Sequence, residues 1–573
     1  MISTNLLKKI YKEYKPSQKM NWRALETKAE KLNKNLEEIL VAEGLMDETE
    51  FYKKMANFLE VPFVALKGKE IKKEILNLIP APIAGTHQVI AFDKEKNDLK
   101  MAMADPTDIQ TIEFLRRKTG LEPKVYLTPI SDLKEAMRRY HMGLASDLNF
   151  VQENGEQAAG SDLKKAAEEL PIINIVNSVV EHAVFEGASD IHIEPAEKEI
   201  IIRYRIDGIL KPIMTLPKNI QNGIIARIKI LANLKIDEHM IPQDGRFKIQ
   251  LQDDKLAFRV SIIPVYDGEK IVMRILHEGV KPLTLEQLGF LEEQKKIVEN
   301  AIKKPHGMIL VTGPTGSGKT TTLYSILGIV NQPGVNISTI EDPIEYRMPG
   351  VNQSQINPKI GFTFASGLRA FLRQDPNIIM VGEIRDQETA EIAIHAAMTG
   401  HLVFSTLHTN DAPTTLPRLV DMGVPPFLVA YTANIIIAQR LVRKICPFCK
   451  KEYKLDKAAA IELGKAFETD KLLKLFKDNN VLKKEEKNLE TLTLYQGAGC
   501  GRCGQTGYKG RVGIYEVLEI DEVLTKKINE RATANDIKNY AREHGMTTIL
   551  EDGLVKTKMG VTTIREILRV TKE

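Results

Sequence analysis

A glycine-rich loop between an apolar run and a helical segment constrains the fold of this chain more than any other stretch. Residues 308–312 form a short apolar run that predicts a buried strand, and residues 323–330 have the spacing of a helix. Between them, residues 313–320 spell Gly-Pro-Thr-Gly-Ser-Gly-Lys-Thr, which fits the G-x-x-x-x-G-K-[ST] pattern of a P-loop. Because the strand and the helix flank the loop in the order that this motif needs, the sequence predicts a nucleoside triphosphate site.

The residue types in this loop suit phosphate binding. The glycines allow backbone N–H groups to turn toward phosphate oxygens, and the N-terminus of the following helix adds a favourable dipole. Lys319 is expected to face the β- and γ-phosphates of ATP, and the Thr320 hydroxyl is expected to hold Mg²⁺. The predicted nucleotide-binding residues of the loop are Gly313, Pro314, Thr315, Gly316, Ser317, Gly318, Lys319, Thr320 and Thr321.

Carboxylates follow two further predicted strands. Residues 335–340 form a strand that leads into Glu341-Asp-Pro-Ile-Glu345, and residues 378–383 form an apolar strand that ends in Glu383. The second pattern is that of a Walker B strand, so Glu383 is a candidate to hold Mg²⁺ directly or through water. Strands that alternate with helices over this region predict a parallel sheet with helices on both faces, and such sheets place their sites at the carboxyl ends of strands.

Length and charge limit the other possibilities. At 573 residues the chain is longer than a domain with a single hydrophobic core usually is, so several domains are expected. Its 80 basic and 76 acidic residues leave a net charge of +4, which gives no electrostatic argument for nucleic acid. No apolar run reaches membrane-spanning length, and residues 1–15 lack the apolar centre of a signal peptide, so we expect a cytoplasmic protein.

Changes in composition predict four consecutive segments. Residues 1–142 form a small mixed domain, and residues 143–169 are polar and rich in small residues, which is typical of a linker. Residues 170–282 form an α+β domain rich in arginine, and by themselves these arginines indicate no more than solvated strand faces. Residues 283–573 contain the P-loop and form the ATPase domain. The strands predicted in the α+β domain span 191–194, 200–206, 255–263 and 270–276.

All four cysteines lie in two C-x-x-C pairs. Cys446 and Cys449 form one pair and Cys500 and Cys503 the other, and four thiolates at this spacing predict one tetrahedral Zn²⁺. Four unrelated thiols or a redox pair are the alternatives, but a redox motif needs one pair rather than two. The lysine- and glutamate-rich segment 450–499 is expected to be a helical excursion closed at its base by the metal. Because this segment has no continuous row of basic residues, we predict a structural zinc site rather than a site that binds nucleic acid.

Several stretches together resemble one family, the secretion ATPases of type II secretion and type IV pilus systems. The resemblance covers nearly the whole chain and is strongest from about residue 170 onward. Stretches 352–353, 370–376 and 411–417 resemble the pilus-extension branch more closely than the type II secretion branch. The motifs that carry the resemblance are 187–195, 203–208, the Walker A loop 313–320, an aspartate box at 339–345, a Walker B segment at 381–386, a histidine box at 401–410, and the paired C-x-x-C that follows 439–443.

The resemblance implies an α/β multidomain architecture. An N-terminal MshEN-like domain would precede a PAS-like α+β domain and a RecA-like ATPase domain with a zinc-bound tetracysteine excursion. The family forms a ring of six, with its ATP site between the second domain and the ATPase domain. Some members bind cyclic di-GMP through a motif that opens Arg-Leu-Gly and ends in Gln, but this chain has Asn-Leu-Glu at 35–37 and Phe58. We therefore expect docking to a membrane platform rather than cyclic di-GMP binding.

The resemblance also assigns catalytic roles. Glu341 would be the general base that positions the attacking water, with Glu345 as its rival, and Glu383 would serve Mg²⁺. His401 and His408 would sense the γ-phosphate or the subunit contact. The arginines expected to approach the phosphates and stabilise transition-state charge are Arg205, Arg227 and Arg246.

Three functions compete. The first is a hexameric ATPase that drives pilus extension at the inner-membrane platform, with pseudopilus assembly in type II secretion as its near alternative. The second is a P-loop DNA translocase, which the balanced charge disfavours. The third is a regulatory module with an inactive site, which the presence of Lys319, Glu341 and Glu383 disfavours. We therefore expect ATP, Mg²⁺ and Zn²⁺ as cofactors, membrane association only through partners, and no nucleic acid.

Overall fold

The computed structural model describes Trp22 and most of the chain from residue 47 to residue 571. The positions inside this span that it does not describe are 77, 81–82, 85–86, 134, 138–169, 252–253, 278–281, 456–468, 484, 487 and 501–502. The predicted linker 143–169 and the departure from the cyclic di-GMP motif at 35–37 therefore lie outside the described residues.

The chain divides into two compact units. One comprises residues 1–276 together with the short segment 499–505, and the other comprises residues 277–498 and 506–573. Among the described residues, the structure contains no helix that is both long and apolar enough to cross a membrane.

The first part of the first unit is built on a three-stranded sheet. β1 (Val89–Glu95) and β2 (Asp98–Met103) pair antiparallel, and β2 pairs parallel with β3 (Glu122–Leu127) after the intervening α7 (Ile109–Thr119). The buried apolar side chains of β1 and β2 form the core of this part. In the described residues before the sheet, the chain forms α4 (Glu48–Phe58) and α5 (Lys73–Leu76).

The second part of the first unit is the predicted α+β domain. Its six-stranded sheet has the order β6-β5-β4-β9-β8-β7, and α10 (Leu170–Phe185) packs against α11 (Gln221–Leu231). Buried Tyr204 donates a hydrogen bond to the Val179 carbonyl at 2.7 Å and so ties the sheet to α10. The remaining elements are β4 (Ala188–Pro195), β5 (Glu199–Ile206), β6 (Ile209–Pro217), η1 (Lys218–Ile220), β7 (Gln243–Leu251), β8 (Asp254–Val265) and β9 (Gly268–His277).

Two strands of this sheet, β6 and β7, were not predicted from the sequence. Both are edge strands, because they stand at the two ends of the strand order. Pro212 interrupts the alternation of β6, and β7 begins with the polar run Gln-Asp-Gly-Arg. Edge strands tolerate proline and charge because one side of the strand has no partner to satisfy. Their pairing in the sheet, rather than a local pattern, therefore makes these segments strands.

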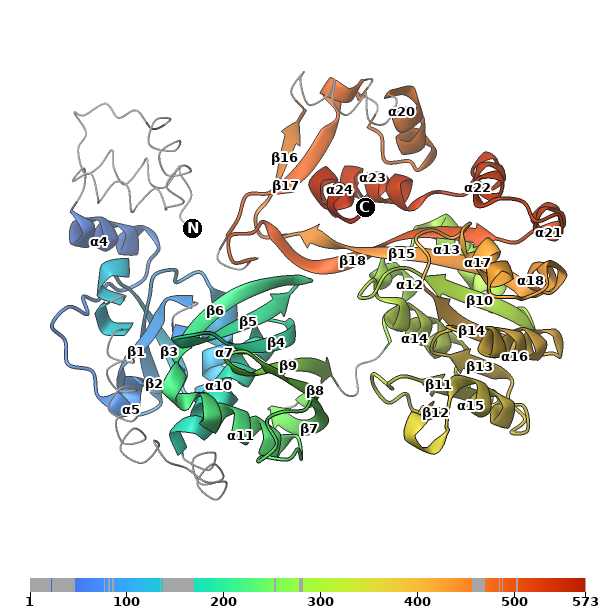
Figure 1. Cartoon of the computed structure of the whole chain (residues 1–573). Helices are drawn as coiled ribbons and strands as arrows, with labels where there is room; N and C mark the ends of the chain where they lie inside the picture. The colour runs from blue at the N-terminus through green and yellow to red at the C-terminus, as the bar shows by residue number, and fades with distance from the viewer. Residues whose placement is uncertain are drawn as a thin grey trace. The chain divides into compact units, whose positions relative to one another are not determined.

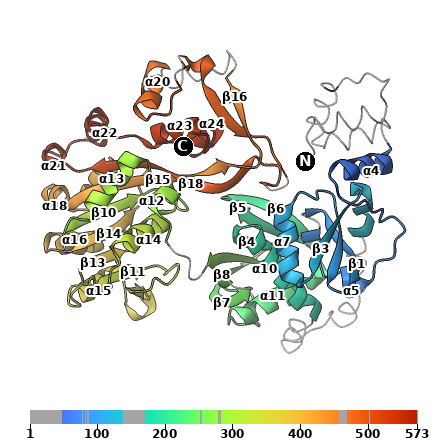
Figure 2. The same cartoon turned by 180° about the vertical axis from the view of Figure 1, so that it is seen from behind.

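The second unit is built around a seven-stranded sheet with the order β12-β11-β13-β14-β10-β15-β18 (Figure 1, Figure 2). Neighbouring strands are parallel except for the antiparallel pair β15 and β18, which confirms the predicted parallel sheet. The strands are β10 (Gly307–Thr312), β11 (Ile337–Glu341), β12 (Val351–Gln355), β13 (Ile378–Val381), β14 (Leu402–Leu407), β15 (Ala433–Ile445) and β18 (Tyr508–Glu519).

Helices cover both faces of this sheet. Successive residues of β10 point to opposite faces, so Met308 and Leu310 join one hydrophobic cluster and Ile309 and Val311 join the other. The first cluster contains buried residues of α15 (Phe364–Phe371), α16 (Gln387–Met398), α17 (Thr415–Asp421) and α18 (Pro426–Thr432). The second contains buried residues of α12 (Leu285–Leu288), α13 (Glu292–Ala301) and α14 (Lys319–Val330). Burial on both faces explains why the strands of this sheet are continuous apolar runs.

The segment between the cysteine pairs corrects one prediction. Residues 450–499 were expected to be helical, but the segment starts and ends as strands, because β16 (Lys450–Lys454) pairs antiparallel with β17 (Thr493–Gly497). The described part also contains α20 (Thr469–Asp478) and η3 (Leu489–Thr491). Leu472 and Phe476 of α20 pack against Leu554. The two strands close the base of the excursion, and this pairing of distant residues is not visible in local composition.

Four helices end the chain, and the last is held by a buried carboxylate. Glu566 of α24 is 0% exposed, and it accepts hydrogen bonds from Arg443 of β15 and from Arg569. Burial alone would raise the pKa of Glu566, but the hydrogen bonds from the two arginines outweigh it and lower the pKa to about 2. The four helices are α21 (Glu522–Asn529), α22 (Ala534–Glu543), α23 (Ile549–Lys558) and α24 (Ile564–Thr571).

We predict that Glu566→Gln releases α24 from the sheet, because removing one partner of a buried ion pair costs about 3–5 kcal/mol. Hydrogen–deuterium exchange of α24 should become faster, whereas Glu388→Gln, which removes the exposed pair with Arg369, should leave exchange unchanged. The pKa of Glu566 is lower in the folded chain, so its stabilisation is complete above about pH 4.5 and is lost as pH falls toward 2. Equal exchange in both variants would contradict the anchoring role.

Candidate active site

The carboxyl ends of parallel strands meet at one edge of the seven-stranded sheet. At the end of β10, Thr312 pairs with Leu407 of β14 on one side and with Ala438 of β15 on the other. Val381, at the end of β13, pairs with Ile340 of β11. This register brings together, at one edge, residues that lie far apart in sequence: the loop 313–318, Glu341, Glu383, His408 and Gln439.

Backbone conformation explains the glycines of the loop. Gly313 has φ +144°, and a Cβ there would lie 2.5 Å from the Gln439 carbonyl oxygen and 2.7 Å from the Ser317 hydroxyl. Gly318 has φ +90° and is the N-cap of α14. Gln439 donates its side-chain amide to the Ser317 carbonyl at 2.7 Å, which fixes the loop against β15. Any side chain at position 313 would push the loop away from the sheet.

Lys319 lies at the start of α14, under the loop. Its ammonium donates hydrogen bonds to the carbonyls of Gly313 at 2.9 Å and Pro314 at 3.3 Å. Burial lowers the pKa of Lys319, an effect that the Glu383 charge opposes and the Arg440 charge reinforces. Thr320 and Thr321 follow in the first turn of the helix. A helix N-terminus with a partly desolvated cation beside it is an anion-binding arrangement, as the sequence predicts.

Glu341, at the end of β11, lies in a buried polar network. Its carboxylate is only 2% exposed, and both oxygens accept hydrogen bonds. Oε1 accepts from the Thr339 hydroxyl at 2.6 Å and from the Gln353 amide at 3.2 Å, and Oε2 accepts from the Tyr324 hydroxyl. Burial raises the pKa of Glu341 in spite of these donors. The carboxylate therefore ties β11, β12 and α14 together, and both of its oxygens are already engaged.

Glu345 lies four residues further along, after the cis peptide bond Asp342–Pro343. Unlike Glu341, it is only partly buried. A general base must come within hydrogen-bond reach of the water that it activates, so a reachable carboxylate suits the role better than one enclosed by protein donors. The two carboxylates of this segment thus differ in burial: Glu341 is enclosed, and Glu345 is partly buried.

Glu383 follows β13 and is paired with two cationic or ionisable groups. Arg385 forms an ion pair with one carboxylate oxygen, and His408 Nε2 lies 3.1 Å from the other. Burial would raise the pKa of Glu383, but the hydrogen bond and charge of Arg385, with a smaller contribution from His408, lower it. The group is therefore ionised at neutral pH, which is the state that a Mg²⁺ ligand needs.

The two histidines of the predicted histidine box lie at opposite edges of the sheet. His408 follows β14 and reaches Glu383, whereas His401 precedes β14, and its Nδ1 lies 3.0 Å from the Ala396 carbonyl at the end of α16. The six residues of β14 separate the two edges by about 20 Å. His401 therefore lies away from the P-loop of its own chain, because β14 runs from one edge of the sheet to the other and the P-loop lies at the carboxyl ends of the strands.

Arg440 was not among the residues predicted for the site. It is largely buried in β15, two residues past the point at which Ala438 pairs with Thr312, and it donates to the Asn410 carbonyl at 3.0 Å. Its charge acts on Lys319. In the sequence, Arg440 stood out only as part of the stretch 439–443 before the cysteine pairs, and the parallel pairing of β15 with β10 is what brings it to the loop.

The three predicted arginines belong to the first unit and occupy different places in it. Arg205 on β5 pairs with Asp190 at 3.4 Å and is 38% exposed. Arg227 lies on α11, and its buried Nε has no hydrogen-bond partner within the described part of the chain. Arg246 lies exposed on β7. Because four strand spacings separate β5 from β7, about 19 Å of sheet lies between Arg205 and Arg246. Within one chain, these two arginines do not converge on a single phosphate.

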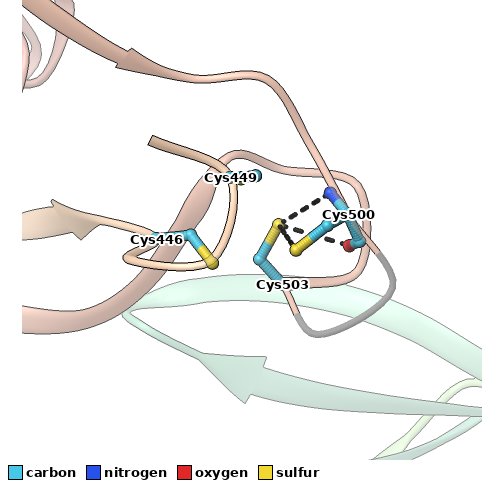
Figure 3. Close-up of side chains that lie close together, drawn as sticks. All are labelled: Cys446, Cys449, Cys500 and Cys503. Atoms are coloured by element: carbon cyan, nitrogen blue, oxygen red, sulfur yellow. Dashed lines mark hydrogen bonds between the residues drawn. The ribbon is translucent and has the colours of Figure 1, made fainter. Parts of the chain in front are cut away.

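The four cysteines converge at the base of the β16–β17 hairpin (Figure 3). Their sulfur atoms all lie within 4.8 Å of one another, and the Cys500 and Cys503 sulfurs are 3.7 Å apart. Two thiolates at about 2.3 Å from a tetrahedral Zn²⁺ would lie about 3.8 Å apart. The Cys500 N–H also donates to the Cys503 sulfur at 3.3 Å, which favours a thiolate. The predicted grouping of the two pairs is confirmed, and its geometry fits zinc.

Comparison with known proteins agrees with this architecture. Residues 165–569 match the family described as "Type II/IV secretion system protein", and residues 59–146 match the MshEN domain. The "Type IV pilus assembly ATPase PilB" of Myxococcus xanthus is 40% identical over 542 residues, which are 92% of this chain and 92% of that protein. The "Type II secretion system protein E" of Pseudomonas aeruginosa is 44% identical over 412 residues, 72% of this chain and 78% of that protein.

A solved structure shows the same fold at lower identity. The Yersinia pseudotuberculosis ATPase DotB is 23% identical, covers 70% of this chain and 93% of its own, and superposes with a TM-score of 0.50. The family match covers 405 residues of this chain, and the PilB relative aligns with nearly the whole chain. Both findings agree with the P-loop, the Walker B carboxylate and the parallel sheet. This chain is therefore an ATPase that belongs to the type II/IV secretion system protein family.

Proposed function

We propose that the chain hydrolyses ATP to drive type IV pilus extension at the inner-membrane platform. The observation that carries this proposal is the PilB relative that covers 92% of both chains, so that the N-terminal part is included in the likeness. Type II secretion is the second candidate, because the protein E relative is slightly more identical, at 44%, over the shorter shared region. The two functions share one chemistry and differ in the filament that is built.

Different residues of the site would bind the phosphates, hold Mg²⁺ and position the attacking water. Lys319 and the backbone N–H groups of 313–318 hold the phosphates, while Thr320 and Glu383 hold Mg²⁺, which would neutralise phosphate charge when bound. Glu345 positions the attacking water, and Glu341 holds its strand and α14 in register through Tyr324, Thr339 and Gln353. The roles expected for Glu341 and Glu345 are thus exchanged, since burial separates the carboxylate that can reach water from the one that cannot.

The arginines support a proposal about assembly. Arg205 and Arg246 lie too far apart in the sheet to serve one phosphate within a chain, and an exposed arginine contributes little to stability by itself. We infer that the chain forms a homohexamer in which arginines act across subunit boundaries. His401 would then serve a subunit contact rather than its own nucleotide. Localisation at the cytoplasmic face of the inner membrane, through the platform protein, follows from the proposed function, with no nucleic acid or cyclic di-GMP required.

The cysteine cluster supports one structural Zn²⁺ per chain on Cys446, Cys449, Cys500 and Cys503. Such sites contribute about 10–16 kcal/mol in small peptides. Two backbone hydrogen bonds already join the cysteine turns to residues next to β17 and β18: the Cys446 N–H donates to the Gly507 carbonyl, and the Ala498 N–H donates to the Cys449 carbonyl. The metal would lock these turns together at the base of the excursion.

We predict that Cys446→Ser or Cys503→Ser lowers bound zinc and speeds hydrogen exchange in 450–497, while ATP binding persists. The reason is that three ligands hold zinc far less tightly than four, whereas the P-loop depends on β10, α14 and Gln439. Elemental analysis and exchange mass spectrometry measure the two effects. Zinc content that does not change in either variant would place the metal elsewhere.

The proposed function is tested in the cell that carries the gene. A chromosomal Lys319→Ala allele should abolish surface pili while export of type II substrates continues, because pilus assembly would lack its ATP turnover. Electron microscopy counts the filaments, and secreted enzyme assays measure export. The reverse pattern would show that the chain drives type II secretion. ATP turnover that depends on added DNA would instead favour a translocase.

A further inference from the structure

A second group of metal-ligand side chains lies within the first unit, apart from the P-loop residues and the cysteines. His182 lies on α10, Glu186 directly follows the end of this helix, four residues further on, and His87 lies just before β1. One ligand atom from each of the three lies within 4.8 Å of the others. His87 Nε2 is 2.8 Å from Glu186 Oε1, and His182 Nε2 is 3.7 Å from the same oxygen.

These separations suit a tetrahedral ion. Two ligands that each lie about 2.0–2.1 Å from Zn²⁺ are about 3.3 Å apart. The two measured separations, 2.8 Å and 3.7 Å, lie on either side of this value. Each of these two separations would therefore need to change by about 0.5 Å, and the third pair of ligand atoms, from His87 and His182, lies within 4.8 Å. Three such ligands would leave one position of a tetrahedral ion for water.

His182 is the residue that most needs a partner. Its side chain is 0% exposed, and neither ring nitrogen has a hydrogen-bond partner among the residues that the structure describes. A buried polar group left unpaired costs about 1–3 kcal/mol, so natural proteins rarely tolerate two on one ring. Complete burial disfavours a charged imidazole, and the unpartnered ring leaves a nitrogen lone pair available. A neutral buried imidazole is the form in which histidine binds metal.

The outer contacts of His87 match those of a metal-binding histidine. Its Nδ1 lies 3.0 Å from Asp108 Oδ2, so the ring can donate to this carboxylate and direct Nε2 toward Glu186. Thr111 donates to the same Asp108 oxygen at 2.6 Å, and Asp108 also caps α7. A carboxylate behind a ligating histidine fixes the tautomer and raises the basicity of the ligand.

We propose that His87, His182 and Glu186 form a zinc site that joins the three-stranded domain to α10 of the second domain. Zinc rather than Mg²⁺ or Ca²⁺ is expected, because two of the three ligands are imidazole nitrogens. Phe114 of α7 packs on Phe185 of α10 at a centroid distance of 4.3 Å, so the two helices lie side by side at this junction (Figure 1, Figure 2). The metal would fasten together two domains that the predicted linker 143–169 connects in sequence.

A proton on His87 is the alternative to a zinc ion at this site. Burial would lower the pKa of His87, but its hydrogen bonds to Asp108 and Glu186 raise it to about 9. A protonated His87 would thus bridge the two carboxylates without any metal, whereas zinc binding would release this proton. The bridge leaves both nitrogens of His182 unpaired, and the metal gives one of them a partner.

The test counts zinc in the full-length chain with Cys446, Cys449, Cys500 and Cys503 all replaced by serine, after equilibrium dialysis at buffered Zn²⁺. We expect one zinc per chain, falling at least about 10-fold in affinity with Glu186→Gln or His87→Ala added. Lys118→Ala, which removes the neighbouring Lys118–Glu181 ion pair across the same two helices, should keep the zinc. These variants avoid His182, whose complete burial makes folding sensitive to replacement.

A second measurement separates binding from folding. Added Zn²⁺ should raise the melting temperature of the four-serine chain and of its Lys118→Ala variant, but not of the His87→Ala variant. If the four-serine chain fails to fold, the same count is made with wild-type cysteines, and His87→Ala should remove one zinc equivalent from the total. A zinc content that His87→Ala and Glu186→Gln leave unchanged would overturn the site and leave the proton-bridged pair as its explanation.

Discussion

A purified chain with Lys319→Ala is expected to lose ATP turnover by at least about 10²-fold, because the transferred phosphate loses its fixed cation. The fold should survive, since the ammonium of Lys319 donates its hydrogen bonds to carbonyls of its own loop, at Gly313 and Pro314. Phosphate release measures the turnover, and circular dichroism with size-exclusion chromatography checks the fold. Wild-type turnover in a well-folded variant would exclude this loop as the catalytic site.

The same variant serves as a partner in a mixing experiment on the arginines. Arg205→Ala, Arg227→Ala and Arg246→Ala subunits are each expected to be inactive alone, as Lys319→Ala subunits are. If an arginine acts across the subunit boundary, a mixed ring places an intact arginine of the Lys319→Ala subunit beside an intact P-loop, and part of the activity returns. Rings shown by mass spectrometry to be mixed, yet inactive, would mean that the arginine serves its own chain or only its domain.

Glu345→Gln is expected to lower turnover by about 10²–10⁴-fold while Mg²⁺-ATP binding persists, because an amide cannot accept the proton of the attacking water. The expectation rests on exposure: Glu345 is partly open, whereas Glu341 is enclosed by Tyr324, Thr339 and Gln353. Turnover by phosphate release and binding by a fluorescent nucleotide separate the catalytic effect from the binding effect.

Glu341→Gln is the matched control. Its amide keeps the size of the carboxylate but places N–H donors against donors already present, so we expect a loss of about 1–3 kcal/mol in stability. Turnover should fall no more than about 10-fold, equivalent to ~1.4 kcal/mol in the barrier. A collapse of turnover in Glu341→Gln with little effect of Glu345→Gln would restore Glu341 as the base.

The chemistry that is local in the chain could be predicted from the sequence alone. The P-loop works through contiguous residues, so Gly313 to Thr320 in order, between a strand and a helix, already specify a phosphate site. Glu383 could be found for the same reason, because it directly follows an apolar strand. The two C-x-x-C pairs predicted a common metal because each pair supplies two thiolates at a fixed spacing.

Burial and convergence were decided only by the tertiary structure. Glu341 and Glu345 are the same residue type, four positions apart, and the sequence does not distinguish them. The pairing of β11 with β12 buries the Glu341 side chain, whereas the Glu345 side chain is only partly buried. Arg440 reaches the loop only because β15 lies parallel beside β10, and no local pattern encodes which strands become neighbours. His401 and His408 share one motif, yet a strand between them sends them to opposite edges, since distance in a sheet follows strand length.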